Sequence, residues 1–305
     1  MNTRYDQGRR TIAPGRCAYW QAWLPPDPVR AVVVIVHGVH EHSGRYAHVG
    51  DWLAGRGYAV YAADHRGHGR SDGRRANIER MALILADLSS FTRFATERHP
   101  DLPVFLVGHS LGGLIALHYA IASTSTRQGP TELDGTEPMV VLNGLVVSGP
   151  AVEALVGSAL QRRLAGVLSA LVPNLGVAAI DADQKISRDP EVVRAYQEDP
   201  LVYRGKLKAR TGAEILAAME NLPARLPGLT VPLLLLHGTD DQICALTGST
   251  MVHDTASSPD KTLRRYQGLY HEVFNEPERE TILADLVSWL NQHLPASDPA
   301  ASSAG

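Results

Sequence analysis

The sequence predicts an α/β fold with a mostly parallel central sheet and helices on both of its faces. Short apolar runs rich in β-branched residues recur along the chain, and segments with the period of a helix separate them. Runs such as Ala31–Val36 are apolar at every position, as is typical of strands covered on both faces. Alternation of such strands with helices favours a parallel sheet between two helical layers.

The expected strands share an apolar run that ends at glycine, proline or a polar loop. In chain order they are Cys17–Leu24, Arg30–Val36, Tyr58–Ala62, Val104–Val107, Gly144–Ser148, Pro232–Leu236 and Leu263–Gln267. Pro25 and Pro26 end the first, since proline cannot donate to a sheet ladder. The third runs into Asp64–Gly73, which is too rich in glycine to be anything but a loop.

The expected helices carry apolar residues at helical spacing. They are Tyr46–Arg56, Met81–Arg98, Leu111–Ala122, Ala151–Val172 and Glu278–His293. The fourth contains Leu155, Leu160, Leu164 and Leu168 with few charges, so it must bury more than one face. Nothing between it and Leu226 looks like a central strand, and the polar segment Thr124–Pro138 is expected to be a surface loop.

These elements divide the chain into a core with an insertion. We expect a first part of the core at residues 1–149, an inserted helical cap at 150–228, and the second part of the core at 229–294. Residues 295–305 form a Pro/Ala/Ser tail that we expect to be disordered.

Composition narrows the class of protein. A hydrophobic content of 44% with 20% charged residues fits a globular protein and excludes a disordered one. The net charge of −3 gives no basic surface for nucleic acid. Two cysteines far apart in sequence suggest no disulfide framework, so a reducing compartment, the cytoplasm, is expected. We expect neither a signal peptide nor a membrane-spanning run, and the sequence does not set an oligomeric state.

The pentapeptide Gly108–Gly112 has the form G-x-S-x-G and lies between an expected strand and an expected helix. This pattern is the nucleophile elbow of α/β-hydrolases. A strand that turns at once into a helix brings its backbone close at the corner, and only glycine avoids a clash there. The turn forces Ser110 into a strained conformation and presents its hydroxyl at the carboxyl edge of the sheet, beside the helix N-terminus.

A serine nucleophile needs a base, and the base needs an orienting carboxylate. In this fold the order along the chain is Ser, acid, His, each just beyond a strand. Asp240 and Asp241 follow the strand that ends at Leu236, and His271 follows the strand that ends at Gln267. The order and the placement together predict a triad of Ser110, an aspartate and His271.

An oxyanion hole needs two donors, and the Leu111 amide is one of them. The second is expected on the loop after the Arg30–Val36 strand, where His37 and Gly38 precede the Val39 amide. His37, His40, His42 and Glu41 also raise the alternative of a zinc site, but no HExxH helix accompanies them. The serine elbow accounts for the chemistry, so no metal and no cofactor are expected.

Longer motifs resemble the monoacylglycerol lipases, in particular the bacterial and actinobacterial members. His37–Tyr46 resembles their HGxxEHSGRY signature, Asp64–Ser71 their D-x-RGHG-x-S loop, and Gly108–Gly113 their GHS-x-GG elbow. Ile186–Val202 and Gly268–Glu278 extend the likeness, which covers about residues 15 to 293. The family spacing HG-x-x-D selects Asp241 as the acid.

The resemblance implies a cap over the triad, an apolar acyl tunnel and a polar end for glycerol. By resemblance Glu41, Arg45, His109 and Tyr196 lie near that polar end; for Glu41 and Arg45 a structural ion pair is an equal alternative. The apolar cap helix could meet an acyl chain or a membrane surface, or could be a buried packing helix. Two positions depart from the family pattern: Val39 stands where Ala or Leu is usual, and His40 where Gly is common. The Thr124–Pro138 loop also looks longer than usual.

The leading interpretation is a serine ester hydrolase that cleaves monoacylglycerols to glycerol and fatty acid. A lysophospholipase or a general carboxylesterase with the same triad is the alternative. Epoxide hydrolases and haloalkane dehalogenases of this fold use an aspartate at the elbow, where this chain has Ser110. A ligand receptor without catalysis is the hypothesis from another class, and the complete triad argues against it.

Overall fold

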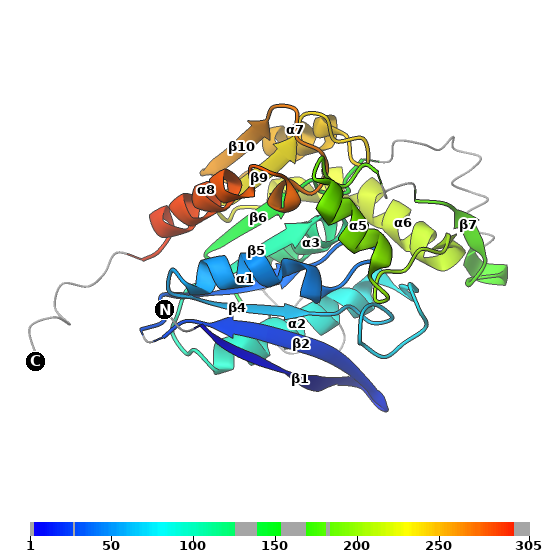
Figure 1. Cartoon of the computed structure of the whole chain (residues 1–305), viewed down its shortest axis with the longest axis horizontal. Coiled ribbons are helices and arrows are strands. Elements are labelled where there is room, and N and C mark those ends of the chain that lie inside the picture. Colours follow the sequence, from blue (N-terminus) through cyan, green and yellow to red (C-terminus); the bar gives the residue numbers. More distant parts are fainter. Residues whose placement is uncertain (1–2, 27, 126–138, 154–168, 181–183, 296–305) are drawn as a thin grey trace, which may run out of the picture.

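The computed structural model describes residues 3–26, 28–125, 139–153, 169–180 and 184–295. Among these, eight strands form the central sheet (Figure 1). They are β1 (Arg4–Ala13), β2 (Arg16–Leu24), β3 (Ala31–Val36), β4 (Tyr58–Ala63), β5 (Val104–His109), β6 (Gly144–Ser148), β9 (Leu233–Gly238) and β10 (Lys261–Tyr266).

The spatial order of the strands is β1-β2-β4-β3-β5-β6-β9-β10. β1 pairs with β2 and β2 with β4 in antiparallel fashion, and every later pair is parallel. The carboxyl ends of β3, β5, β6, β9 and β10 therefore lie along one edge of the sheet. Loops that follow these strands carry the polar residues of the site.

Helices cover both faces of the sheet (Figure 1). They are η1 (Ser43–Tyr46), α1 (Ala47–Ala54), α2 (Met81–Glu97), α3 (Leu111–Ser125), α5 (Pro190–Glu198), α6 (Ala209–Arg225), η3 (Leu226–Gly228), α7 (Leu246–Thr255), η4 (Val273–Asn275) and α8 (Arg279–Gln292). α1 and α8 bury residues such as Leu53 and Leu286 against one face. α2, α3 and α7 bury residues such as Leu88, Leu117 and Val252 against the other. The predicted α/β class, with a mostly parallel sheet between two helical layers, is thus confirmed.

The sequence interpretation missed β1, and it placed other boundaries a few residues away. β1 pairs only with β2 and is half exposed along its length, so its polar sequence carries no apolar run. The helix expected over Tyr46–Arg56 is a 3-10 turn, η1, followed by the shorter α1. β10 begins at Lys261, two residues before the expected start, because its polar first residues pair in register with β9.

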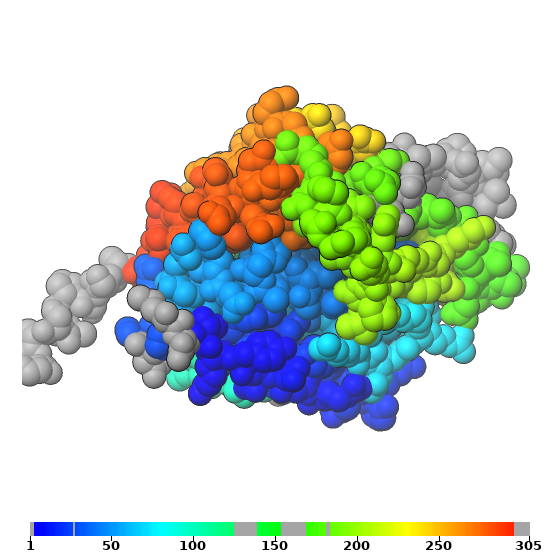
Figure 2. Space-filling model, in the orientation of Figure 1, coloured from blue at the N-terminus to red at the C-terminus, as the bar shows by residue number. Residues whose placement is uncertain are grey.

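The described residues between β6 and β9 contain α5, α6 and a small hairpin of β7 (Gly176–Ala178) with β8 (Leu207–Lys208). The Asp189 side chain caps α5 by accepting a hydrogen bond from the Glu191 amide, and Pro190 is the first residue of the helix. α5 lies beyond the carboxyl ends of the strands (Figure 1), and the green segment that contains it lies on the surface beside the blue and orange parts (Figure 2).

Three expectations fall wholly or mostly on residues that the structure does not describe. The cap helix expected over 151–172, with Leu155, Leu160, Leu164 and Leu168, lies mostly in 154–168. The loop expected over 124–138 lies mostly in 126–138, and the tail expected from 295 lies in 296–305. In the part of the chain that is described, each helix is too short or too polar to cross a bilayer.

Candidate active site

Ser110 sits at the corner between β5 and α3 with a φ of +54°, in the left-handed region. Its amide donates to the carbonyl of Ser148 on β6 at 2.9 Å, and its carbonyl accepts from Gly113 and Ala151, each at 3.0 Å. A Cβ atom on Gly112 would lie 2.0 Å from the Val36 carbonyl oxygen, so glycine alone fits there. The neighbouring strands therefore hold the strained serine in place at the edge of the sheet.

His271 and Asp241 come from the loops after β10 and β9 and meet at this edge. His271 Nδ1 lies 2.7 Å from Asp241 Oδ2, and the Asp241 side chain is only 1% exposed. Asp241 Oδ1 accepts from the amides of Ile243 and Cys244 at 2.8 and 2.9 Å. Asp240 is exposed, and its side chain accepts a hydrogen bond from Thr239 instead. The structure thus brings Asp241, and not Asp240, against His271.

The charges of this pair shift both of its pKa values. Burial alone would raise the Asp241 pKa, but His271 and His237 outweigh burial and hold it well below its ordinary range. Burial alone would lower the His271 pKa, but Asp241 outweighs it and raises that pKa above 6.5. Asp241 therefore stays ionised, and it favours the imidazolium that forms when His271 accepts a proton.

The two amides expected to bind an oxyanion flank Ser110. Leu111 is the first residue of α3, where a backbone N–H has no acceptor within the helix. Val39 lies on the loop after β3 and lines the same pocket as Ser110. Glu41 fixes that loop, because its Oε1 accepts from the Gly38 amide at 2.5 Å. Gly38 also lets the loop approach, since a Cβ there would lie 3.2 Å from Ser110 Cβ.

A buried charge cluster forms part of the lining of the pocket beside Ser110. Arg45 donates to Glu41 at 2.7 Å and to both oxygens of Glu272 at 2.6 and 2.7 Å. Its guanidinium also lies 4.7 Å from the centre of the Tyr196 ring. Burial would lower the Arg45 pKa, but the two carboxylates outweigh it and raise that pKa. Sequence reasoning missed Glu272, although its position directly after His271 was the available signal.

His109 precedes Ser110 in the chain and lies against His271. Its ring centre is 4.6 Å from that of His271, and its Nδ1 lies 3.1 Å from the Ser148 carbonyl oxygen, to which it donates. Burial first, and then the neighbouring His271, lower the His109 pKa to about 3. His109 is thus a neutral ring that packs beside His271 without competing for its proton.

Most of the residues expected at the site line a single pocket. It is lined by the polar or reacting residues Glu41, Arg45, His109, Ser110, Tyr196, His271 and Glu272, with Gly38, Val39 and His40 from the loop after β3. Ile180, Ile186 and Ile243 supply the apolar lining. Leu111 and Asp241 are not among the lining residues, but they adjoin Ser110 and His271, which are. The sequence interpretation had assigned no role to these three isoleucines, and it had considered His40 only for a zinc site and as a departure from the family pattern.

Two histidines of the loop after β3, His37 and His42, form hydrogen bonds to backbone and to an acid and do not converge on one point. His37 Nε2 accepts from the His65 amide at 2.9 Å, so its Nδ1 donates to the Gly38 carbonyl at 2.8 Å. His42 Nδ1 accepts from the Gly44 amide, and its Nε2 donates to Asp199 at 2.8 Å. Over the described ranges, no group of three His, Cys, Asp or Glu side chains could hold a metal ion.

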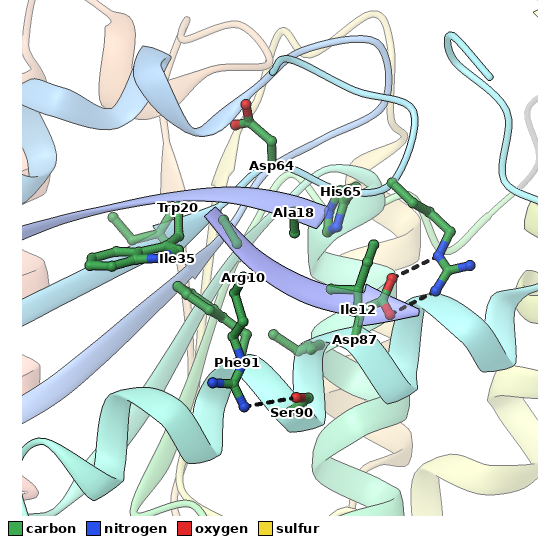
Figure 3. Close-up of a pocket in the computed structure, with 13 residues that line it drawn as sticks. Arg10, Ile12, Ala18, Trp20, Ile35, Asp64, His65, Asp87, Ser90 and Phe91 are labelled. Atoms are coloured by element: carbon green, nitrogen blue, oxygen red, sulfur yellow. Dashed lines mark hydrogen bonds and ion pairs between the residues drawn. The ribbon is translucent and has the colours of Figure 1, made fainter. Parts of the chain in front are cut away.

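A separate pocket lies between the β1–β2 end of the sheet and α2 (Figure 3). Its polar side chains pair with one another: Arg66 donates twice to Asp87 at 2.7 Å, and Arg10 donates to Ser90 at 3.3 Å. Trp20 and Phe91 are among its apolar walls, and both are labelled in Figure 3. None of the residues expected to be catalytic lines it.

Comparison with known proteins gives a consistent likeness. The family model described as serine aminopeptidase, S33, matches residues 27–278. A monoacylglycerol lipase of Mycolicibacterium smegmatis is 40% identical over 294 residues, which are 96% of this chain and 99% of that protein. A human monoglyceride lipase is 34% identical, covering 92% of this chain and 88% of that protein. The crystal structure of a Paleococcus ferrophilus monoacylglycerol lipase, 30% identical, superposes with a TM-score of 0.74 over 96% of this chain and 100% of that one.

Proposed function

The chain belongs to the serine aminopeptidase S33 family of α/β-hydrolases, and from this we propose that it is a serine hydrolase that cleaves monoacylglycerols to glycerol and a free fatty acid. The observation that carries the proposal is the pocket in which Ser110, His271 and the loop of Val39 meet a buried polar wall. The likeness to two monoacylglycerol lipases and a monoglyceride lipase over nearly the whole chain supports the substrate class.

In the proposed mechanism Ser110 is the nucleophile, His271 the general base and Asp241 the orienting acid. Ser110 Oγ attacks the ester carbonyl as His271 Nε2 takes its proton. The Val39 and Leu111 amides donate to the oxyanion of the tetrahedral intermediate. Its collapse breaks the ester bond, and glycerol leaves with the proton from His271. Water then attacks the acyl-enzyme, gives its proton to His271 and releases the fatty acid, and the proton returns to Ser110.

The glycerol end of the substrate is proposed to lie against Glu41, Arg45, His109 and Tyr196. Arg45 is bound by both carboxylates, so Glu41 and Glu272 are each held in place before a ligand arrives. Carboxylate oxygens keep lone pairs that can accept from glycerol hydroxyls. The ion pair and the polar subsite are therefore compatible readings of the same residues.

The same cluster favours an ester over a peptide substrate. An aminopeptidase must bind a free α-ammonium group, which calls for a carboxylate available to it. Arg45 is shared by the two carboxylates that line this pocket, and each carboxylate oxygen already accepts from the guanidinium or from another donor, so neither carboxylate is left free for an ammonium group. A neutral hydroxylated leaving group fits this wall better than a cation does.

The proposed cap spans residues 150–228, and we propose that part of it touches lipid surfaces transiently. Leu171, Val172, Leu175 and Val177 are 76%, 42%, 49% and 44% exposed, and they gather in one short segment. Exposed apolar side chains grouped in this way are typical of contact with a partner or a lipid surface. For the location we propose the cytoplasm, where both free cysteines, Cys17 and Cys244, would stay reduced.

We expect monooleoylglycerol to be cleaved much faster than trioleoylglycerol. We propose that the single acyl chain lies against the apolar lining of the pocket, at about 0.8 kcal/mol per buried methylene. A triacylglycerol must place two further chains elsewhere, and the same pocket is also lined by the charged residues Glu41, Arg45 and Glu272. The measurement is a paired assay of both lipids under matched detergent conditions. Equal or faster triacylglycerol cleavage would identify a general lipase instead.

A short p-nitrophenyl ester separates an enzyme from a receptor of the same fold, because only the enzyme turns it over. The same ester gives a pH profile, and we expect kcat/KM to fall with acid through a midpoint above 6.5. The base must be neutral, and a raised His271 pKa means that it becomes protonated at a higher pH.

The pH measurement needs a check that the protein stays folded. Burial lowers the pKa values of His40 and His109 in the folded protein. Below pH 6.5 the unfolded chain therefore binds protons on these histidines that the folded protein does not, and the free energy of unfolding decreases as the pH falls. Tryptophan fluorescence recorded over the same range marks where unfolding begins. An acid midpoint below 6.5 in folded protein would contradict the assignment of His271 as a base raised by Asp241.

A further inference from the structure

His40 adopts a backbone conformation that suits glycine. Its φ is +67°, although it carries a full imidazole side chain. A non-glycine residue in this region is strained, because Cβ crowds the following carbonyl oxygen. The sequence resemblance placed a common glycine at this position. Something in this chain must therefore hold the strained residue where it is.

Tyr203, from the segment after α5, contacts His40 in two ways. Its amide donates to the His40 carbonyl at 2.8 Å. Its ring meets the imidazole edge-to-face, with ring centres 4.9 Å apart and planes at 78°. On another side the Lys208 ammonium lies 5.3 Å from the centre of the Tyr203 ring. The aromatic contact is of the kind that stabilises a side-chain pair beyond simple burial.

The ring contact with Tyr203 is made to a buried imidazole. His40 is 4% exposed, and its Nε2 is buried without a hydrogen-bond partner in the described part of the chain. Burial first, and then the nearby His68, Lys208 and Arg75, lower its pKa to about 3, so the ring is neutral. A neutral ring without a hydrogen bond at Nε2 is held by packing, and Tyr203 supplies the aromatic surface.

The segment after α5 is tied to the same region at further points. His42, two residues after His40, donates to Asp199 at 2.8 Å. Arg75 donates to the Leu201 carbonyl and to the Gly69 carbonyl, which joins this segment to the loop after β4. The segment from Asp199 to Tyr203 therefore lies fixed on the loop that carries Val39.

We propose that Tyr203 is a positioning residue for the oxyanion hole: by holding strained His40, it fixes the adjacent Val39 amide in the orientation that meets the oxyanion. The inference rests on the proposed function, in which Val39 is a donor. Without the ring contact, His40 relaxes out of the left-handed region in part of the molecules. Those molecules bind substrate but lack one oxyanion donor.

The test is the hydrolysis of p-nitrophenyl butyrate by Tyr203→Ala. An edge-to-face pair can shift an equilibrium by up to about tenfold, and we expect kcat to fall by about that factor with KM nearly unchanged. Tyr203→Phe keeps the ring and should restore most of the loss. Tyr5→Ala, on the distant and half-exposed β1, is the matched control for removing a tyrosine ring.

A second test introduces Tyr203→Ala into a variant that lacks the His40 side chain, and it shows whether Tyr203 acts through His40. His40→Gly removes both the strain and the imidazole, so Tyr203→Ala introduced into it should lower kcat less than twofold further. If Tyr203→Ala does not fold, as judged by circular dichroism, Tyr203→Leu replaces it with the same expectations. A loss of equal size in both backgrounds, a rise in KM instead of a fall in kcat, or full activity of Tyr203→Ala would each overturn the proposal.

Failure of the proposed function would look different. If Ser110 were not the nucleophile, Ser110→Ala would hydrolyse the same ester, whatever Tyr203 does. If the enzyme were an esterase without monoacylglycerol activity, the p-nitrophenyl assay would still report on Tyr203. The positioning role and the substrate class are thus separated by two assays on the same variants.

Discussion

Ser110→Ala is expected to abolish hydrolysis of monooleoylglycerol and of p-nitrophenyl butyrate while the protein stays folded. Alanine keeps the backbone hydrogen bonds of residue 110 to Ser148, Gly113 and Ala151, but it has no oxygen to attack the ester. In a serine protease, loss of the nucleophile costs about 10⁶ in kcat. Rates of both substrates are measured beside the wild-type protein, and thermal unfolding serves as the control for the fold.

The residual rate of this variant is informative. The Val39 and Leu111 amides and the polar wall remain, so slow water attack on a bound ester can persist at a low level. Activity close to that of the wild type in folded Ser110→Ala protein would exclude a serine nucleophile at the elbow.

Asp241→Asn is expected to cost about 10⁴ in kcat, as the same change does in chymotrypsin, whereas Asp240→Asn should cost little. The amides of Ile243 and Cys244 both donate to Asp241 Oδ1, so an asparagine keeps its oxygen there. Its NH₂ group then faces His271 Nδ1, which must give up its proton to accept. The proton moves to Nε2, and the ring can no longer take a proton from Ser110.

Asp240→Asn is the matched control, because it makes the same chemical change one residue away. Asp240 is exposed and accepts from Thr239, so its loss leaves His271 untouched. The two variants are compared by kcat with p-nitrophenyl butyrate at a pH where His271 is neutral in the wild-type protein. A larger loss in Asp240→Asn than in Asp241→Asn would contradict the assignment.

The parts of the fold that the sequence predicted are those in which burial leaves a mark on composition. β3 and β5 are apolar at nearly every position because both of their faces are covered. The nucleophile elbow could be predicted because a side chain at Gly108 or Gly112 would clash with neighbouring atoms, so the sequence there is restricted to glycine. β1 was missed because an edge strand needs backbone pairing and not an apolar sequence.

The site was predicted unevenly for a physical reason. The order of Ser110, Asp241 and His271 follows from strand order, since loops after parallel strands meet at one edge. The bidentate contact of Arg45 with Glu272 joins residues 227 positions apart, and no local pattern encodes it. The left-handed backbone of His40 likewise depends on a contact with Tyr203, far along the chain.

The most direct test of the proposed function compares two oleoyl lipids that differ only in the head group. Purified protein is given monooleoylglycerol or oleoyl lysophosphatidylcholine in the same mixed micelles, and kcat/KM is measured from the release of oleate. We expect a clear preference for monooleoylglycerol, with both activities absent in Ser110→Ala. Equal or faster release from the lysophospholipid would contradict a monoacylglycerol hydrolase and would identify a lysophospholipase with the same Ser110.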